Sequence, residues 1–153
     1  MSDSIPEGGD AARDALVRRH RAFGWWSLLV FLTLGMGLEA LHAFKAGWFL
    51  DVDTEPRRLM LRLAHSHGTL FALVHLAFAA GIASLPLDRL PRAAVASACL
   101  IGASVLMPGG FLLGGLVVSG GDPGPGVVLA PIGGLLLAVG VFVAARIFTA
   151  RRS

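Results

Sequence analysis

The chain has no tyrosine, a single cysteine and few charged residues, which make up 15% of its 153 residues. Because Cys99 has no second cysteine to pair with, an intrachain disulfide is excluded. Without tyrosine, and with one carboxylate in its apolar segments, the chain offers few groups for acid–base catalysis. We find no nucleophile with an accompanying base and no basic surface beyond the flanks of the apolar segments. Independent enzymatic activity and nucleic-acid binding are therefore not expected.

Apolar residues are abundant instead. They make up 55% of the chain, and the mean hydropathy is +0.72, whereas soluble domains contain about 45 to 50%. A helix of about 20 residues crosses the hydrocarbon core of a bilayer, and uncharged runs of that length occupy residues 63–87, 93–121 and 123–145. A fourth run, residues 22–44, is broken only by Glu39. The sequence predicts an all-α, four-helix transmembrane bundle.

The predicted spans cover residues 22–44, 59–85, 93–117 and 126–147, within one transmembrane domain of residues 22–147. Residues 1–21 are predicted to be a polar N-terminal tail that becomes helical from about Asp10, and residues 148–153 a basic C-terminal tail. Four of the 13 basic residues, Lys45, Arg57, Arg58 and Arg62, fall on one side of this arrangement, and the other nine fall with the termini. The positive-inside rule then predicts a multi-pass protein of the inner (plasma) membrane with both termini cytoplasmic. Its first partner is the lipid bilayer.

Ionisable side chains within the spans are the main pointers to function, because charges at membrane depth are costly. Glu39 and His42 are three residues apart and share a helix face. His65 and His67 project about 200° apart on a helix, so we expect them to serve different surfaces. Helical rise places all four within about 14 Å of the outer boundary. We therefore expect a polar pocket in the outer half of the bundle.

Two ligands are considered for this pocket. A metal ion would use Glu39, His42 and His65, since Glu-x-x-His is the spacing found in di-iron bundles. A haem b would use His42 with either His65 or His67, because two axial imidazoles from neighbouring helices are a sufficient protein contribution. Taken alone, each histidine is also compatible with a hydrogen-bonded packing role, and His75, isolated in the inner half, is expected to be structural.

Three further residues complete the expected site. Arg62 is predicted to reach outward to the interface or to pair with Glu39. Pro108 and Pro131 each interrupt the helical hydrogen bonds near the outer end of a span, which membrane helices tolerate where the backbone lines a cavity or packs against protein. The Gly110-x-x-x-Gly114 spacing indicates close helix packing or room for a flat ligand.

Two short segments resemble the catalytic subunit of haem–copper oxidases. Residues 64–70, Ala-His-Ser-His-Gly-Thr-Leu, are similar to its Ala-His-Gly-Thr segment, and residues 107–111, Met-Pro-Gly-Gly-Phe, to its Met-Pro and Gly-Gly-Phe elements. The resemblance implies that His67 is an axial ligand of a low-spin haem. The copper-site histidine motifs are absent, so oxygen reduction is not implied. More broadly, the chain resembles small four-span integral membrane proteins of bacteria.

Three functions follow as hypotheses. The first is cofactor binding in a redox membrane complex. The second is proton or solute handling through Glu39 and His42, for which His75, Ser97 and Ser104 are the deeper polar candidates. The third is an accessory or assembly subunit, in which the glycine-rich faces of spans three and four dock onto other membrane subunits or onto a second copy of the chain.

Overall fold

The structure, a computed structural model, describes residues 7–150. Four long helices account for most of the chain: α1 (Glu7–Ala43), α3 (Glu55–Ala83), α4 (Leu90–Leu116) and α5 (Leu129–Thr149). The connections hold a short helix α2 (Gly47–Leu50), the 3₁₀ turns η1 (Val52–Thr54), η2 (Leu87–Arg89) and η3 (Pro125–Val128), and a small hairpin of β1 (Val118–Ser119) and β2 (Asp122–Pro123). The predicted all-α four-helix bundle is confirmed.

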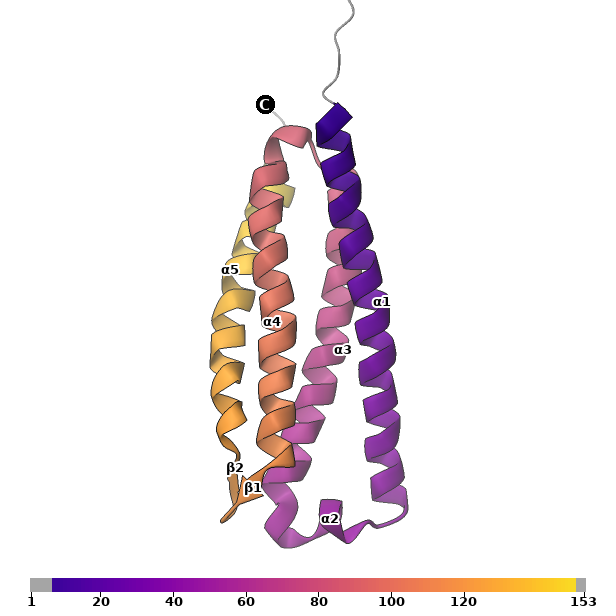
Figure 1. Cartoon of the computed structure of the whole chain (residues 1–153), viewed down its shortest axis with the longest axis vertical. Coiled ribbons are helices and arrows are strands. Elements are labelled where there is room, and N and C mark those ends of the chain that lie inside the picture. Colours follow the sequence, from indigo (N-terminus) through magenta and orange to yellow (C-terminus); the bar gives the residue numbers. More distant parts are fainter. Residues whose placement is uncertain (1–6, 151–153) are drawn as a thin grey trace, which may run out of the picture.

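Each long helix is apolar enough to cross a membrane, so the chain is a multi-pass membrane protein. The helix α1 begins and α5 ends at one end of the bundle, which we call the terminal end (Figure 1). The α2 helix and the hairpin lie at the opposite end, which we call the loop end (Figure 1). An even number of crossings returns the chain to the end at which it started.

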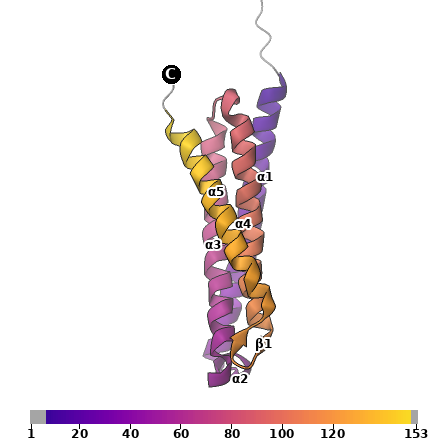
Figure 2. The same cartoon turned by 90° about the vertical axis from the view of Figure 1, so that its left-hand side faces the viewer.

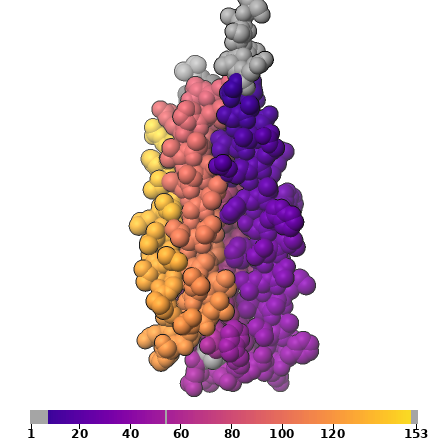
Figure 3. Space-filling view, viewed as in Figure 1, coloured from indigo at the N-terminus to yellow at the C-terminus, as the bar shows by residue number. Residues whose placement is uncertain are grey.

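The main helix contacts are those of α1 with α3, of α3 with α4 and of α4 with α5. Figure 2 shows α5 crossing α4 obliquely, and Figure 3 shows α4 between α1 and α5 on one face of the molecule. The α1–α3 contact and the α4–α5 contact therefore form two seams on opposite sides of the molecule.

Helix boundaries differ from the prediction mainly at the start of α1. This helix begins at Glu7, three residues before Asp10, where the predicted tail was expected to become helical, so most of that segment belongs to the bundle. Val17 is buried, and His20 has no exposed surface. Arg13 also forms an ion pair with Asp10 one turn earlier, at 2.6 Å, which supports the helix modestly. Residues 1–6 and 151–153 of the predicted tails lie outside the described residues.

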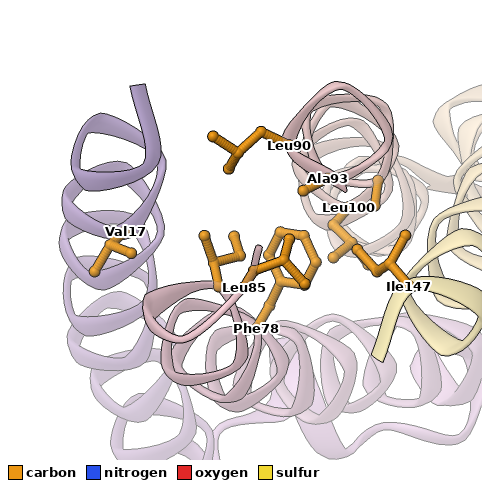
Figure 4. Packing of buried hydrophobic residues seen from close by; sticks show 9 residues of the cluster. Val17, Phe78, Leu85, Leu90, Ala93, Leu100 and Ile147 are labelled. Atoms are coloured by element: carbon orange, nitrogen blue, oxygen red, sulfur yellow. The ribbon is translucent and has the colours of Figure 1, made fainter. Parts of the chain in front are cut away.

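The largest apolar core lies near the terminal end, and Figure 4 shows the packing of its side chains. It joins Val17 of α1 to side chains of α3, α4 and α5, including Phe78, Leu100 and Ile147. Nearby, the Arg89 guanidinium donates to the carbonyl oxygen of Ile147 at 2.8 Å and so satisfies one of the free carbonyls at the end of α5. This end of the bundle is closed by apolar side chains.

Glycines bring α4 and α5 into close contact. A Cβ added to Gly110 would lie 2.7 Å from the backbone nitrogen of Ala130, and one added to Gly133 would lie 2.6 Å from the nitrogen of Met107. These glycine faces thus pack on one another within the chain, in the close approach that small residues permit.

Arginine also ties the loop end together. The Arg57 guanidinium donates to the carbonyl oxygen of Trp48 at 2.9 Å and to that of Gly115 at 3.3 Å, and it lies 4.5 Å from the centre of the Trp48 ring. One side chain therefore links α2, α3 and α4.

Candidate functional site

A groove between α1 and α3 near the loop end is the first candidate site. Its volume is about 490 Å³. Its polar lining consists of Glu39, His42, Arg62 and His65, and its apolar and glycine lining of Leu32, Gly35, Met36, Leu38 and Phe49. All four polar residues were singled out in the sequence. We refer to this site as the groove.

His65 is held in one orientation at the groove. Its ring lies against Gly35 of α1, where any larger residue would overlap it. Its Nδ1 lies 2.7 Å from the carbonyl oxygen of Phe31. Because a carbonyl can only accept, Nδ1 carries the proton, and Nε2 of the neutral ring holds a lone pair. Nε2 makes no hydrogen bond to the described residues, so it is available to a ligand.

The other polar residues of the groove are less constrained. Glu39, His42 and Arg62 are exposed. Arg62 and Glu39, both among the described residues, do not form the predicted ion pair. Within residues 7–150, no three His, Cys, Asp or Glu side chains are grouped closely enough to hold a metal ion. Glu39, His42 and His65 therefore share the groove without forming a compact metal centre.

His67 serves a different surface from His65, as its helical position predicts. Its Nδ1 donates to the carbonyl oxygen of Leu63 at 2.9 Å, and its ring lies 5.1 Å from that of Phe111 on α4. It does not line the groove. The two predicted prolines also lie away from the groove, with Pro108 buried in α4 and Pro131 exposed on α5.

A second polar site lies deeper in the bundle and was not predicted as a unit. The Nδ1 atoms of His20 and His75 are 2.6 Å apart, and both rings are fully buried. The Nε2 of His20 lies 2.8 Å from Ser97 Oγ, and the Nε2 of His75 lies 2.8 Å from Ser104 Oγ. We call these four residues the histidine–serine chain. It joins α1, α3 and α4.

The protons in this chain can be assigned from its last member. Ser104 donates its only hydroxyl proton to the carbonyl oxygen of Leu100, at 2.7 Å, so it must accept from His75 Nε2. Neutral His75 then accepts at Nδ1 from His20, and neutral His20 accepts at Nε2 from Ser97. Every ring nitrogen has a partner and every bond one proton. The arrangement meets the requirement that buried polar groups be hydrogen-bonded.

Aromatic rings enclose the histidine pair. The Phe78 ring meets the His20 ring edge-on at 4.7 Å, and the Phe23 ring lies 4.5 Å from the His75 ring. His75 is thus the packed residue that the sequence predicted. Its partner His20 was missed because it falls among arginines, although its spacing from Val17 and Gly24 places all three on the buried face of α1.

Thr69 lies between the two sites. Among the described residues, its Oγ1 is the buried side-chain polar atom without a hydrogen-bond partner. It is one helical turn from His65, and six residues, or about 9 Å, from His75. A polar atom without a partner at this depth needs an explanation.

The chain was also compared with known proteins. No protein-family model, curated protein or solved structure matches it.

Proposed function

We propose that this membrane protein binds haem b or a similar flat redox cofactor in the groove, with His65 as the ligand and His42 as a second candidate ligand. One observation carries the proposal. His65 lines the groove, and because its Nδ1 donates to the Phe31 carbonyl, its Nε2 keeps a lone pair that can bind a metal. Histidines that bind metals commonly have their second nitrogen fixed in this way.

The rest of the groove fits an amphipathic cofactor. Leu32, Met36 and Leu38 give an apolar wall for a macrocycle, and the exposed Arg62 guanidinium suits a cofactor carboxylate. A bound haem would supply one-electron redox chemistry. The protein's residues hold it, set its exposure to water and orient its ligand.

A redox cofactor at this position implies a place in a redox membrane complex. We place the protein in the inner (plasma) membrane with the terminal end cytoplasmic, because seven of the 11 basic residues within residues 7–150 lie towards that end. The groove then faces the outer half of the bilayer. Electron-transfer partners would be other membrane subunits. Since the predicted glycine faces of α4 and α5 pack on each other, such partners would meet other surfaces.

The decisive test is the visible spectrum of detergent-purified protein expressed with haem supplied. We expect a Soret band that His65→Ala abolishes and His67→Ala retains, since His67 lies outside the groove. Loss of the band with His67→Ala alone would instead support the haem–copper oxidase resemblance and overturn the groove assignment. Absence of the band from the unaltered protein would overturn haem binding altogether.

A metal ion is the second candidate, because Glu39, His42 and His65 line the same groove; the three side chains would have to move closer together to bind it. Elemental analysis of the same preparation decides it. A stoichiometric metal that is lost with Glu39→Gln would support this alternative. A preparation with neither chromophore nor metal would overturn both proposals and favour an accessory subunit, to be sought by co-purification.

A further inference from the structure

The histidine–serine chain is separate from the groove, and the cofactor proposal does not use it. We propose that this chain, Thr69 and the groove together form a path that transfers protons across the membrane. The path needs no cofactor, so it can be tested independently of the proposed function. Its basis is a continuous set of hydrogen bonds that joins the buried side chains of His20, His75 and Ser97 to the partly buried Ser104, across three helices.

The histidine–serine chain lies in the half of the bundle nearer the terminal end. His20 lies between Arg19 and Arg21, which are exposed and belong to the charged flank of the first span. His75 is at the centre of the uncharged run of residues 63–87. Ser97 and Ser104 are seven residues apart on α4, a rise of about 10 Å. The histidine–serine chain therefore extends about 10 Å along the bundle axis, with the two histidine rings at nearly the same depth.

Proton transfer along the chain balances at each step. A proton added to Ser97 Oγ lets that hydroxyl pass its own proton to His20 Nε2. His20 then passes its Nδ1 proton to His75 Nδ1, and His75 passes its Nε2 proton to Ser104 Oγ. Ser104 releases the proton it had donated to Leu100. One proton has entered and one has left, and each donor has become an acceptor. Histidine suits this role because either ring nitrogen can hold the proton.

The second half of the path runs from Ser104 to the groove. Thr69 is placed within it, and its buried hydroxyl has no partner among the described residues. Buried waters commonly bind polar groups of this kind, and water molecules linking Thr69 to His75 would close the gap of about 9 Å. One turn further, His65 leads to Glu39 and His42, which are exposed in the groove.

Proton flux into liposomes tests the path. The purified protein would be reconstituted with a trapped pH dye, and a potassium gradient with valinomycin would impose a membrane potential. We expect faster acidification than in protein-free liposomes. Flux equal to that of protein-free liposomes would overturn the proposal.

Two variants and a matched control locate the path. His75→Gln keeps a polar side chain but cannot relay a proton between two nitrogens, and Thr69→Val removes only the unpartnered hydroxyl. Both should lower the flux to the protein-free rate. Thr33→Val is the control, because the Thr33 hydroxyl is exposed and bonds to Leu29 of its own helix. It should keep the full flux.

Thr69→Val also guards against misfolding, since it leaves the histidine–serine chain intact. Each variant would be checked by size-exclusion chromatography before reconstitution. A folded Thr69→Val protein with unchanged flux would overturn the path through Thr69, and equal loss in Thr33→Val would show that the flux does not follow this path.

Discussion

The groove and the histidine–serine chain use the same residue type in opposite ways. In the groove, His42 and Glu39 are exposed, and His65 has one ring nitrogen without a hydrogen bond to the described residues. In the chain, both histidines are fully buried and all four ring nitrogens are paired. Because an unpaired polar group in an apolar interior costs several kcal/mol, burial and pairing go together. The groove can bind a ligand from outside, whereas the ring nitrogens of the histidine–serine chain already have partners within the protein.

This difference predicts that the histidine–serine chain contributes more than the groove to the free energy of unfolding. The largest effect is expected from His75→Ala, which leaves a cavity and removes the partner of His20 and of Ser104. We expect a loss of about 3 to 5 kcal/mol in the free energy of unfolding. His42→Ala in the groove is the control and should change it by less than about 0.5 kcal/mol. Unfolding by denaturing detergent, followed by circular dichroism, measures both. Equal losses would remove the contrast between the two sites.

A smaller effect is expected where the groove meets α1. In Gly35→Ala the new methyl group overlaps the His65 ring, so the ring must move and its bond to Phe31 weakens. Such overpacking costs about 1 to 3 kcal/mol. Gly37→Ala is a matched control two residues away, because nothing lies within 4 Å of the added atom. The same unfolding measurement applies. A Gly35→Ala protein as stable as Gly37→Ala would show that the His65 ring is not fixed.

A single hydrogen bond of the chain should contribute less. Ser97→Ala leaves His20 Nε2 without its donor, and polar contacts between membrane helices are worth about 0.6 kcal/mol on average, with a maximum near 1.7. We expect a loss within that range. Ser66→Ala is the comparison, because the Ser66 hydroxyl is exposed and bonds within its own helix. If Ser66→Ala lowered the free energy of unfolding as much as Ser97→Ala, the buried hydrogen bond of Ser97 would contribute no more than an exposed one.

The smallest effect is expected for Glu39→Gln. Glu39 is exposed and makes no ion pair with the described residues, so neutralising it should change the unfolding free energy by less than about 0.5 kcal/mol. Its effect should appear in ligand binding or proton flux instead. A large loss of stability would mean that Glu39 has a structural partner. The groove would then stabilise the fold, as the histidine–serine chain is expected to do.

The sequence predicted the four helices well because each apolar run is long enough to leave no other arrangement in a bilayer. It also predicted that His65 and His67 face different surfaces, since helical geometry alone decides that. It predicted helix from about Asp10, close to the observed start at Glu7, but it did not identify His20 as a buried residue. Hydropathy ends at the charged residues Arg18, Arg19 and Arg21, whereas the helix continues by packing Val17 and His20 on α3 and α4.

The hydrogen bonds of the histidine–serine chain could not be predicted from the sequence either. Ser97, Ser104 and His75 were each recognised as polar candidates. Only the packing of α1, α3 and α4 brings Ser97 to His20, His20 to His75 and His75 to Ser104. Long-range contacts of this kind have no local signature. The groove was easier to foresee, because depth along a helix can be counted residue by residue.

The length of α1 has a mechanical consequence. Its 37 residues extend about 55 Å, whereas the hydrocarbon layer is about 30 Å thick. Part of this helix therefore extends beyond the lipid. Because His20 lies on this helix and bonds to His75 of α3 and Ser97 of α4, a displacement of the extended part of α1 is transmitted to the histidine–serine chain.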